Sequence, residues 1–446
     1  MDYSGKKASF YTLGCKLNFS ETSSIARRFE DIGFERVEFS ERADVVVINS
    51  CSVTAEGDKK TRNIIRHAIR KNPESMVVVT GCYAQLQPET IQKIEGVDLI
   101  VGSAEKQNIA DYLGNLIKKE QTEIHVQEPK EIKKYFHAYS FGDRTRSFLK
   151  VQDGCDYYCT YCTIPFARGR SRNDSIANTV AEAREIAEKG TLEIILTGVN
   201  IGDFGKSTGE KFIDLLKGLE QIEKLKRIRI SSVEPNLLTD EIIEFAAQSK
   251  RIMPHFHLPL QSGSNEVLTL MKRKYKREVF ESRVEKIKKE IPNAFIGVDI
   301  IAGTNGETDD LFSDSYRFIA DLDVSQLHAF PYSERPGTKA LEIIPVIPVK
   351  DRKHRTQSLI ALSDRKTEHF YCQNLGTIHE VLFEEQKDKK SLSGFTENYI
   401  RVETEYHEEL ENHIVQVKLE NILSNGNVWG TVLETPFDKL RELSLE

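Results

Sequence analysis

The chain has 446 residues, of which 39% are hydrophobic and 29% are charged, so it is long enough to form two or three domains with ordinary folded cores. No apolar run approaches the length needed to span a bilayer, and the N-terminal segment lacks the apolar core of a signal peptide, which predicts a cytoplasmic protein without a membrane partner. The formal net charge of −7 argues against a generally basic nucleic-acid binder, but it is compatible with a local basic patch.

The first part of the chain, residues 6–120, alternates strand-like and helix-like segments. Three apolar runs alternate with two amphipathic stretches, at residues 9–14, 20–33, 43–50, 57–72 and 75–81. Such alternation predicts a doubly wound parallel sheet whose strands are joined by crossover helices. The polar stretch at residues 118–134 is typical of a linker and predicts the end of this domain.

Residues 141–373 show a second alternating series. Six strand-like runs stand between helical patterns, at residues 146–154, 192–198, 227–233, 255–260, 295–303 and 325–332. Six strands with crossover helices predict a partial TIM-like (β/α)6 barrel, which would place its chemistry at the carboxyl ends of the strands.

Beyond residue 374 the helical periodicity gives way to short β-rich runs separated by turn-forming residues. Residues 374–441 are therefore predicted to form a third domain, a small all-β barrel. The sequence as a whole predicts an α/β protein with an all-β domain after the barrel.

Three cysteines lie close together just after the first predicted barrel strand. Cys155, Cys159 and Cys162 occur in the run CDYYCTYC. Three thiolates in such a loop can hold one corner of an iron–sulfur cubane and leave the fourth iron free for another ligand. A zinc site is the alternative, but structural zinc prefers four ligands in paired CxxC motifs, and the sequence has no second pair.

Three further cysteines, Cys15, Cys51 and Cys82, are far apart in the sequence, but each directly follows a predicted strand of the first domain. The carboxyl ends of parallel strands open onto one crevice, so these thiols are expected to converge. One interpretation is that they are small buried hydrophobes, because free cysteine is among the most buried residue types. The interpretation favoured by the barrel cysteines is a second cluster, again with one iron that lacks a protein ligand.

The motifs around both sets of cysteines resemble the methylthiotransferase family of radical S-adenosylmethionine (SAM) enzymes. The matching runs are GCKLNFSE (14–21), INSCSVT (48–54), TGCYAQ (80–85), CDYYCTYCTIPFARGR (155–170), SSVEP (231–235), HLPLQSGSNEVLTLMKRKY (257–275) and FPYSERPGTKA (330–340). The resemblance covers essentially the whole chain. It implies an N-terminal cluster domain, a radical SAM barrel and a C-terminal TRAM domain.

The resemblance also implies the cofactors and the chemistry. The expected cofactors are two [4Fe-4S] clusters and SAM, with an external electron donor and a sulfur source as partners. One SAM molecule is expected to methylate sulfur at the N-terminal cluster, and a second to yield the radical that removes a ring hydrogen from the substrate. SSVEP and QDGC are most similar to the branch that places a methylthio group on carbon 2 of N6-threonylcarbamoyladenosine at position 37, in the anticodon loop of tRNA.

Three alternative functions stay open at this point. Related branches of the family act on isopentenyladenosine in tRNA or on an aspartate of a ribosomal protein. A more remote alternative is a non-enzymatic iron–sulfur protein that carries electrons or senses iron. Ferredoxin spacing is absent, however, and electron transfer does not need a whole barrel.

Five further residues are candidate cofactor contacts. Thr197 and Gly198 close the second predicted barrel strand, where the family commonly binds the amino group of SAM through backbone atoms. Ser232 and Glu234 end the third strand and have groups suited to the ribose or methionine part of SAM. Arg168 is a natural partner of the cofactor carboxylate or of an RNA phosphate. The alternatives are a turn glycine, a strand-end cap and a solvated arginine.

The basic run KRKYKR at residues 272–277 is a candidate contact for the phosphates of the anticodon stem, with a solvated helix face as the alternative. His257 and Gln261 are candidates for orienting the modified adenine, although a structural role is the simpler interpretation of His257.

Two features depart from the family pattern. Thr304 and Asn305 stand where the family is expected to have an aromatic residue followed by proline. Residues 374–446 contain 7 Lys and Arg against 15 Asp and Glu, a net charge of −8, which leaves +1 for the rest of the chain. An acidic TRAM domain favours a basic ribosomal protein as substrate, whereas the motifs favour tRNA, with Lys387, Lys389 and Lys390 as possible contacts.

Overall fold

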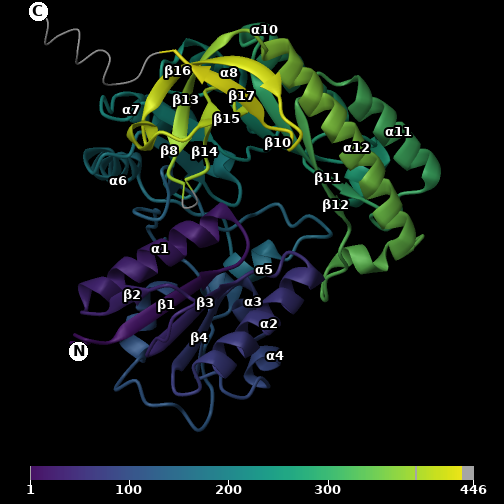
Figure 1. Cartoon of the computed structure of the whole chain (residues 1–446). Helices are drawn as coiled ribbons and strands as arrows, with labels where there is room; N and C mark the ends of the chain where they lie inside the picture. Colours follow the sequence, from purple (N-terminus) through teal and green to yellow (C-terminus); the bar gives the residue numbers. More distant parts are fainter. Residues whose placement is uncertain (1, 387–388, 434–446) are drawn as a thin grey trace, which may run out of the picture.

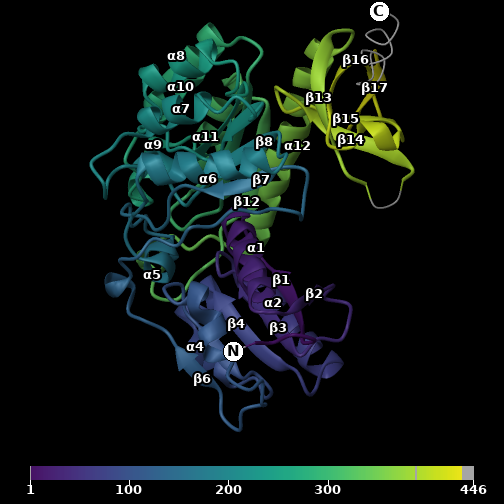
Figure 2. The same cartoon turned by 90° about the vertical axis from the view of Figure 1, so that its left-hand side faces the viewer.

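A computed structural model describes residues 2–386 and 389–433 of the protein. The described chain forms three packed units: an N-terminal sheet, a central barrel and a C-terminal β-barrel (Figure 1). In the view turned by 90°, helix α1 (Lys16–Asp31) lies where the N-terminal unit meets the central barrel (Figure 2). No helix in the described ranges is both long and apolar enough to cross a bilayer.

The N-terminal sheet has six parallel strands in the order β2-β1-β3-β4-β5-β6. Two separate hydrophobic cores cover its two faces, one under α1 and η1 and the other under α2, α3 and α4, which confirms the doubly wound prediction. Its elements are β1 (Lys7–Thr12), α1, β2 (Glu35–Val37), β3 (Val45–Ser50), α2 (Ala55–Lys71), β4 (Met76–Gly81), α3 (Cys82–Leu86), α4 (Pro88–Gln92), β5 (Leu99–Val101), η1 (Lys106–Tyr112) and β6 (Glu123–His125).

Strand β6 lies inside the segment predicted to be a linker. It pairs with β5 along Leu99–Val101 and forms the edge of the sheet. Its three residues are only partly buried, so the sequence shows no apolar run there. The sheet therefore extends beyond residue 120, where the first domain was predicted to end.

The central barrel has six parallel strands, as predicted. Sheets β7-β8-β9 and β10-β11-β12 are joined by isolated bridges between Ile228 and Ile252 and between Ser232 and His257. Its elements are β7 (Ser147–Lys150), α5 (Ile164–Arg168), α6 (Ile176–Glu188), β8 (Glu193–Thr197), α7 (Phe212–Glu220), β9 (Arg227–Ile230), α8 (Asp240–Gln248), β10 (His255–Gln261), α9 (Asn265–Leu270), α10 (Arg277–Glu290), β11 (Phe295–Ala302), α11 (Asp309–Asp321), β12 (Gln326–Pro331) and α12 (Val349–Asn374).

The C-terminal unit is a closed barrel in the order β13-β14-β15-β17-β16, which confirms the all-β prediction. Residues 434–441 of the predicted third domain, and Lys387, lie outside the described residues. The strands are β13 (Ile378–Glu384), β14 (Ser391–Thr396), β15 (Arg401–Glu405), β16 (Ile414–Ile422) and β17 (Val428–Val432). Short 3₁₀ turns elsewhere are η2 (Pro129–Glu131), η3 (Ile201–Asp203), η4 (Lys339–Glu342) and η5 (Glu408–Leu410).

Two buried arginines of β9 join the C-terminal barrel to the central barrel. Arg227 donates to the carbonyls of Phe395 (3.1 Å) and Glu380 (2.6 Å). Arg229 donates to the carbonyls of Thr396 (2.7 Å) and Glu397 (2.9 Å). Because these arginines are about 1% exposed, the contact fixes the C-terminal barrel with charged donors removed from water.

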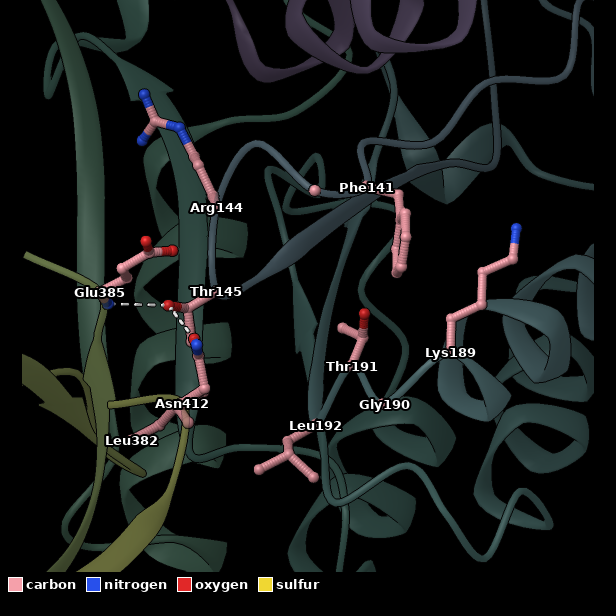
Figure 3. Close-up of a pocket in the computed structure, with 11 residues that line it drawn as sticks. Phe141, Arg144, Thr145, Lys189, Gly190, Thr191, Leu192, Leu382, Glu385 and Asn412 are labelled. Carbon is pink, nitrogen blue, oxygen red and sulfur yellow. Dashed lines mark hydrogen bonds between the residues drawn. The ribbon is translucent and has the colours of Figure 1, made fainter. Parts of the chain in front are cut away.

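A cavity of about 220 Å³ lies at the same contact (Figure 3). Thr145 donates to the Asn412 side chain (2.6 Å) and accepts from the backbone N–H of Glu385 (3.1 Å), so it bridges the two units. The charged ends of Arg144, Lys189 and Glu385 stay apart from one another. None of the predicted site residues lines this cavity.

Candidate active site

The cysteines of the N-terminal unit gather at the carboxyl edge of its sheet. Cys15 caps the N-terminus of α1, Cys51 directly follows β3, and Cys82 begins α3 after β4. A Cβ atom on Gly14 would lie only 2.8 Å from the Cβ and 3.0 Å from the Sγ of Cys51. A side chain at this position would push Cys51 away, so the glycine is what lets the first two cysteine segments approach each other. The cysteines lie at the carboxyl ends of neighbouring strands, beside the boundary between β1 and β3. The order of the strands reverses at this boundary, which is where doubly wound sheets bind ligands.

Two of the three thiols, Cys15 and Cys51, are in an environment that disfavours the free thiolate. Burial raises the pKa of Cys51 to about 11, and the nearby Cys82 and Cys15 add to the rise. Burial also raises the pKa of Cys15, which keeps contact with solvent through the crevice, while the positive charge of Arg168 opposes that rise. The thiols of Cys15 and Cys51 therefore keep their protons at neutral pH until a metal displaces them.

The second set of cysteines lies in the loop after β7, at the rim of the central barrel. Burial raises the pKa of both Cys155 and Cys162 to about 12. The loop is held in place through Thr160, whose N–H donates to the carbonyl of Met271 (3.1 Å) and whose hydroxyl donates to the carbonyl of Leu270 (2.9 Å). The position at the carboxyl end of a barrel strand is the one where barrel enzymes carry their chemistry.

Arg273, in the turn between α9 and α10, contacts the cysteine loop. Its guanidinium donates to the Sγ of Cys159 (3.2 Å) and forms an ion pair with Glu234. Burial raises the pKa of the Glu234 carboxyl, and the Arg273 charge opposes this rise. Arg273 was predicted only as part of a basic run facing RNA. The side chain is 3% exposed, and its position in the run KRKYKR gives no local sign of that burial.

The predicted residue Thr197 is the last residue of β8, and Gly198 begins the loop that follows. A Cβ on Gly198 would lie 2.9 Å from the carbonyl oxygen of Gln152, and the Gln152 side chain accepts from the N–H groups of Val199 (3.0 Å) and Asn200 (2.8 Å). The loop is thus packed tightly against the end of β7.

Two buried polar groups in this region lack hydrogen-bond partners among the described residues. Both side-chain atoms of Asn200 and the Oδ2 of Asp203 form no hydrogen bond with the described residues, although the two residues are at most 8% exposed. The Oδ2 of Asp203 lies 3.9 Å from the Nζ of Lys206. Buried amides are normally satisfied, so these groups fit a polar ligand such as SAM beside the cysteine loop. Sequence reasoning did not select Asn200, which follows directly after the motif LTGV.

The remaining predicted residues have protein partners. The Arg168 guanidinium is bound by Glu21, Asp153 and Asn18, so the structure gives it different partners from the predicted cofactor carboxylate or RNA phosphate. Ser232 forms a backbone bridge with His257, whose ring nitrogen lies 2.9 Å from Asp299.

Residues 333–340, in the motif FPYSERPGTKA, touch both cysteine loops. Arg335 donates to Ser52 (2.8 Å) and pairs with Asp58 (2.7 Å) in the segment that follows Cys51. At the other end, the N–H of Ala340 donates to the carbonyl of Thr160 (3.0 Å). The motif therefore ties the two cysteine sets to each other.

The two donor sets have the chemistry of iron–sulfur cluster ligands. Each set supplies three thiols, which suits a cluster with one iron left without a protein ligand.

Comparison with known proteins identifies the domains of the chain. Residues 7–102 match the family model described as uncharacterized protein family UPF0004, and residues 149–319 match that of the radical SAM superfamily. The solved structure of the radical SAM methyltransferase TsrM from Kitasatospora setae, with cobalamin and a [4Fe-4S] cluster bound, has a TM-score of 0.56 at 15% identity, covering 77% of this chain and 78% of TsrM. That likeness concerns the fold alone.

Relatives in sequence cover nearly the full chain. It is 40% identical to the threonylcarbamoyladenosine tRNA methylthiotransferase MtaB of Bacillus subtilis, over 92% of this chain and 93% of the relative. It is 36% identical to the MtaB of Thermotoga maritima, over 93% and 94%. A tRNA-2-methylthio-N(6)-dimethylallyladenosine synthase of Clostridium tetani is 30% identical, over 99% and 96%. The chain therefore belongs to the radical SAM methylthiotransferase family.

Proposed function

We propose that this protein places a methylthio group on carbon 2 of N6-threonylcarbamoyladenosine at position 37 of tRNA. The observation that carries the proposal is the meeting of two three-cysteine sets at one junction, which the segment 333–340 ties together. A ring C–H has no acidic proton for a side-chain base to remove, so the reaction calls for radical chemistry. The identity to MtaB relatives over most of the chain supports this choice of substrate.

In this proposal each cysteine set has its own cluster. Cys155, Cys159 and Cys162 hold one [4Fe-4S] cluster, and Cys15, Cys51 and Cys82 hold the second. When bound, the clusters and SAM supply the radical and the methylthio group. The protein's own contribution is to place the two sets at one junction and to surround the barrel loop with groups for SAM. Those groups are Thr197, Gly198, Asn200, Ser232, Glu234 and Arg273.

The proposal also requires partners. An external one-electron donor must reduce the barrel cluster, and a sulfur source must resupply the N-terminal site. The tRNA must bring its anticodon loop to the junction, in the cytoplasm where tRNA is modified.

One observation weakens the ribosomal-protein alternative. Acidic groups of the C-terminal barrel face cations of the central barrel: Glu384 pairs with Arg146 at 2.9 Å, and Glu380 lies 3.9 Å from Arg227. Part of the net charge of −8 on residues 374–446 is therefore neutralised within the molecule and does not attract a basic partner. The dimethylallyl branch has weaker support, because the Clostridium tetani relative is 30% identical to this chain, whereas the Bacillus subtilis MtaB is 40% identical.

Nucleoside analysis of tRNA from a strain that lacks this gene tests the substrate. We expect 2-methylthio-N6-threonylcarbamoyladenosine to disappear and its unthiolated precursor to accumulate. An unchanged level of the methylthio nucleoside would contradict the proposal, and loss of the methylthio group from an isopentenyladenosine would support the other tRNA branch.

Iron analysis after anaerobic reconstitution tests the two-cluster assignment. The intact chain should bind about eight irons, and the C15A/C51A/C82A variant about four. Cys372→Ala is the matched control, because Cys372 is an exposed cysteine of α12, and it should leave the iron content unchanged. Four irons in the intact chain would rule out the second cluster.

A further inference from the structure

Six charged side chains are buried together where α1 meets β7 and α5. Each of these side chains is at most 7% exposed, and they come from both the N-terminal unit and the central barrel. The members of this buried charge cluster are Glu21, Lys106, Lys150, Asp153, Arg168 and Arg172.

Arg168 lies at the centre of the buried charge cluster. It donates to Glu21 (2.9 and 3.0 Å) in α1 and to Asp153 (2.9 Å), two residues before Cys155. Lys150 also binds both carboxylates, at 2.9 and 2.8 Å. A bidentate arginine has a fixed geometry, so Arg168 sets the orientation as well as the distance between α1 and the barrel loop.

A chain of hydrogen bonds extends from Arg168 to the N-terminal cysteines. Its second nitrogen donates to the side chain of Asn18 (2.7 Å). Asn18 in turn donates to the carbonyl of Leu13 (2.8 Å), two residues before Cys15, and to that of Ser50 (3.0 Å), directly before Cys51.

Arg168 is also connected to the barrel cysteine loop. Asp153 accepts from the N–H of Gly154 (2.8 Å), and the N–H of Cys155 donates to the carbonyl of Gly169 (3.1 Å), the residue after Arg168. The two cysteine sets are thus connected through one guanidinium by buried and half-buried groups.

The charges of this cluster do not balance. Four cations face two carboxylates, a surplus of two positive charges away from water. Buried charge is expensive unless it is paired, so the surplus calls for anions nearby. The hydrogen bonds through Asn18 bring the Arg168 charge close to the segments that carry Cys15 and Cys51, whose thiolates supply such anions when a cluster is bound.

We propose that Arg168 is a positioning residue that couples the two cluster sites. Its guanidinium holds the barrel cysteine loop at a fixed place relative to the N-terminal cysteines, and its charge stabilises the anionic ligands of the N-terminal cluster. The inference rests on the proposed function. Without Arg168, radical formation continues at the barrel, but it is no longer matched by methylthio transfer at the neighbouring site.

The first test measures coupling in the reconstituted full-length enzyme with its tRNA. We expect Arg168→Gln to cleave SAM to 5′-deoxyadenosine at near the wild-type rate, with about tenfold less methylthiolated product per cleavage, a size typical of coupling between sites. Arg168→Lys keeps the charge but lacks the planar fork, so it should also uncouple the enzyme. Arg251→Gln is the matched control, since Arg251 binds a carboxylate and a carbonyl far from either cysteine set.

The second test measures the charge effect without turnover. In a C155A/C159A/C162A background only the N-terminal cluster remains, and its reduction potential can be titrated by electron paramagnetic resonance. Loss of a nearby positive charge disfavours the more negative reduced state, so Arg168→Gln should lower the potential, while Arg168→Lys should restore it.

Three outcomes would overturn the inference. The first is that Arg168→Gln forms as much methylthiolated product per SAM cleavage as the wild type and leaves the reduction potential of the N-terminal cluster unchanged. The second is loss of SAM cleavage while the barrel cluster is fully loaded, which would make Arg168 a cofactor ligand. The third is an unloaded barrel cluster, which would show that Arg168 serves only the fold. Failure of the proposed function looks different, because the wild-type enzyme itself would then form no methylthio product or bind only one cluster.

Discussion

Arg273 illustrates at the scale of one residue how buried charge is used beside the barrel cysteines. Its guanidinium joins Cys159, Glu234 and the hydroxyl of Tyr275 (3.0 Å). A guanidinium donates several hydrogen bonds in one plane, whereas a lysine ammonium cannot reproduce that fork. The side chain therefore fixes the loop that holds Cys159 to the carboxylate at the end of β9.

Replacing Arg273 by glutamine leaves the Glu234 carboxyl buried without its cation. We expect SAM cleavage to fall by at least about tenfold, because removing one partner of a buried pair costs about 3–5 kcal/mol of local stability and displaces the loop. Isothermal titration with SAM and a 5′-deoxyadenosine assay measure the effect. Lys274→Gln, at the neighbouring exposed position, is the control, and equal activity of the two variants would contradict the assigned role.

At the scale of elements, an exposed basic patch lies next to the barrel cysteine loop. Lys272 and Lys274 precede α10, Lys339 lies in η4, and all three border a cavity of about 450 Å³ that Cys159 and Cys162 also line. These lysines form no ion pair with the described residues. The exposed rings of Tyr158 and Phe166 line the same cavity, and aromatic rings next to cations are typical of surfaces that bind single-stranded RNA.

Charge reversal of this patch should weaken tRNA binding. The K272E/K274E/K339E variant should bind tRNA more weakly. The slope of log K against log salt concentration should become shallower by up to about three, one for each lost phosphate contact. SAM cleavage without tRNA should stay near wild type. The control variant K224E/K226E/K250E changes the net charge equally at the other end of the barrel strands, and the same loss there would show a nonspecific charge effect.

The sequence predicts the long elements well because their burial leaves a pattern. Strands β3 and β4 are buried along their whole length and appear as apolar runs. The short strand β2, like β6, carries no such run and is set by pairing with a neighbour. Three-residue elements of this kind depend on tertiary contacts, which local periodicity does not record.

The same reasoning explains which site residues the sequence reveals. The cysteines stand out because strand ends converge and their spacing is distinctive. The partners of Arg168 do not, because Glu21 lies 147 positions away and comes from another unit. Asn305, which departs from the family pattern, donates to the carbonyl of Ala340 (3.0 Å), so the departure adds a contact to the segment that joins the cysteine loops.

At the scale of the whole molecule, each junction between units is built from buried charge. The N-terminal unit is held by the charge cluster around Arg168 and by Arg335, and the C-terminal barrel is held by Arg227 and Arg229. Charged junctions need correct geometry to offset desolvation, so they specify one arrangement of the units. This gives a chain of three units the fixed geometry that the two proposed clusters would require.

The C-terminal junction should fail if Arg229 is replaced by methionine. Arg229 binds Glu193 (2.8 Å) and two carbonyls of the C-terminal barrel, so the variant leaves a fully buried carboxylate with only the longer contacts to Arg227 (3.8 Å) and Arg146 (3.7 Å). We expect faster proteolysis at residues 375–377, between α12 and β13, and weaker tRNA binding, with unchanged iron content. The loss of about 3–5 kcal/mol expected for breaking a buried pair is enough to separate the units part of the time.

Lys217→Ala, which removes an exposed pair with Glu241, should change none of these measurements. If Arg229→Met resists proteolysis as the wild type does, the apolar contacts of the C-terminal barrel hold the junction and the charged contacts are secondary.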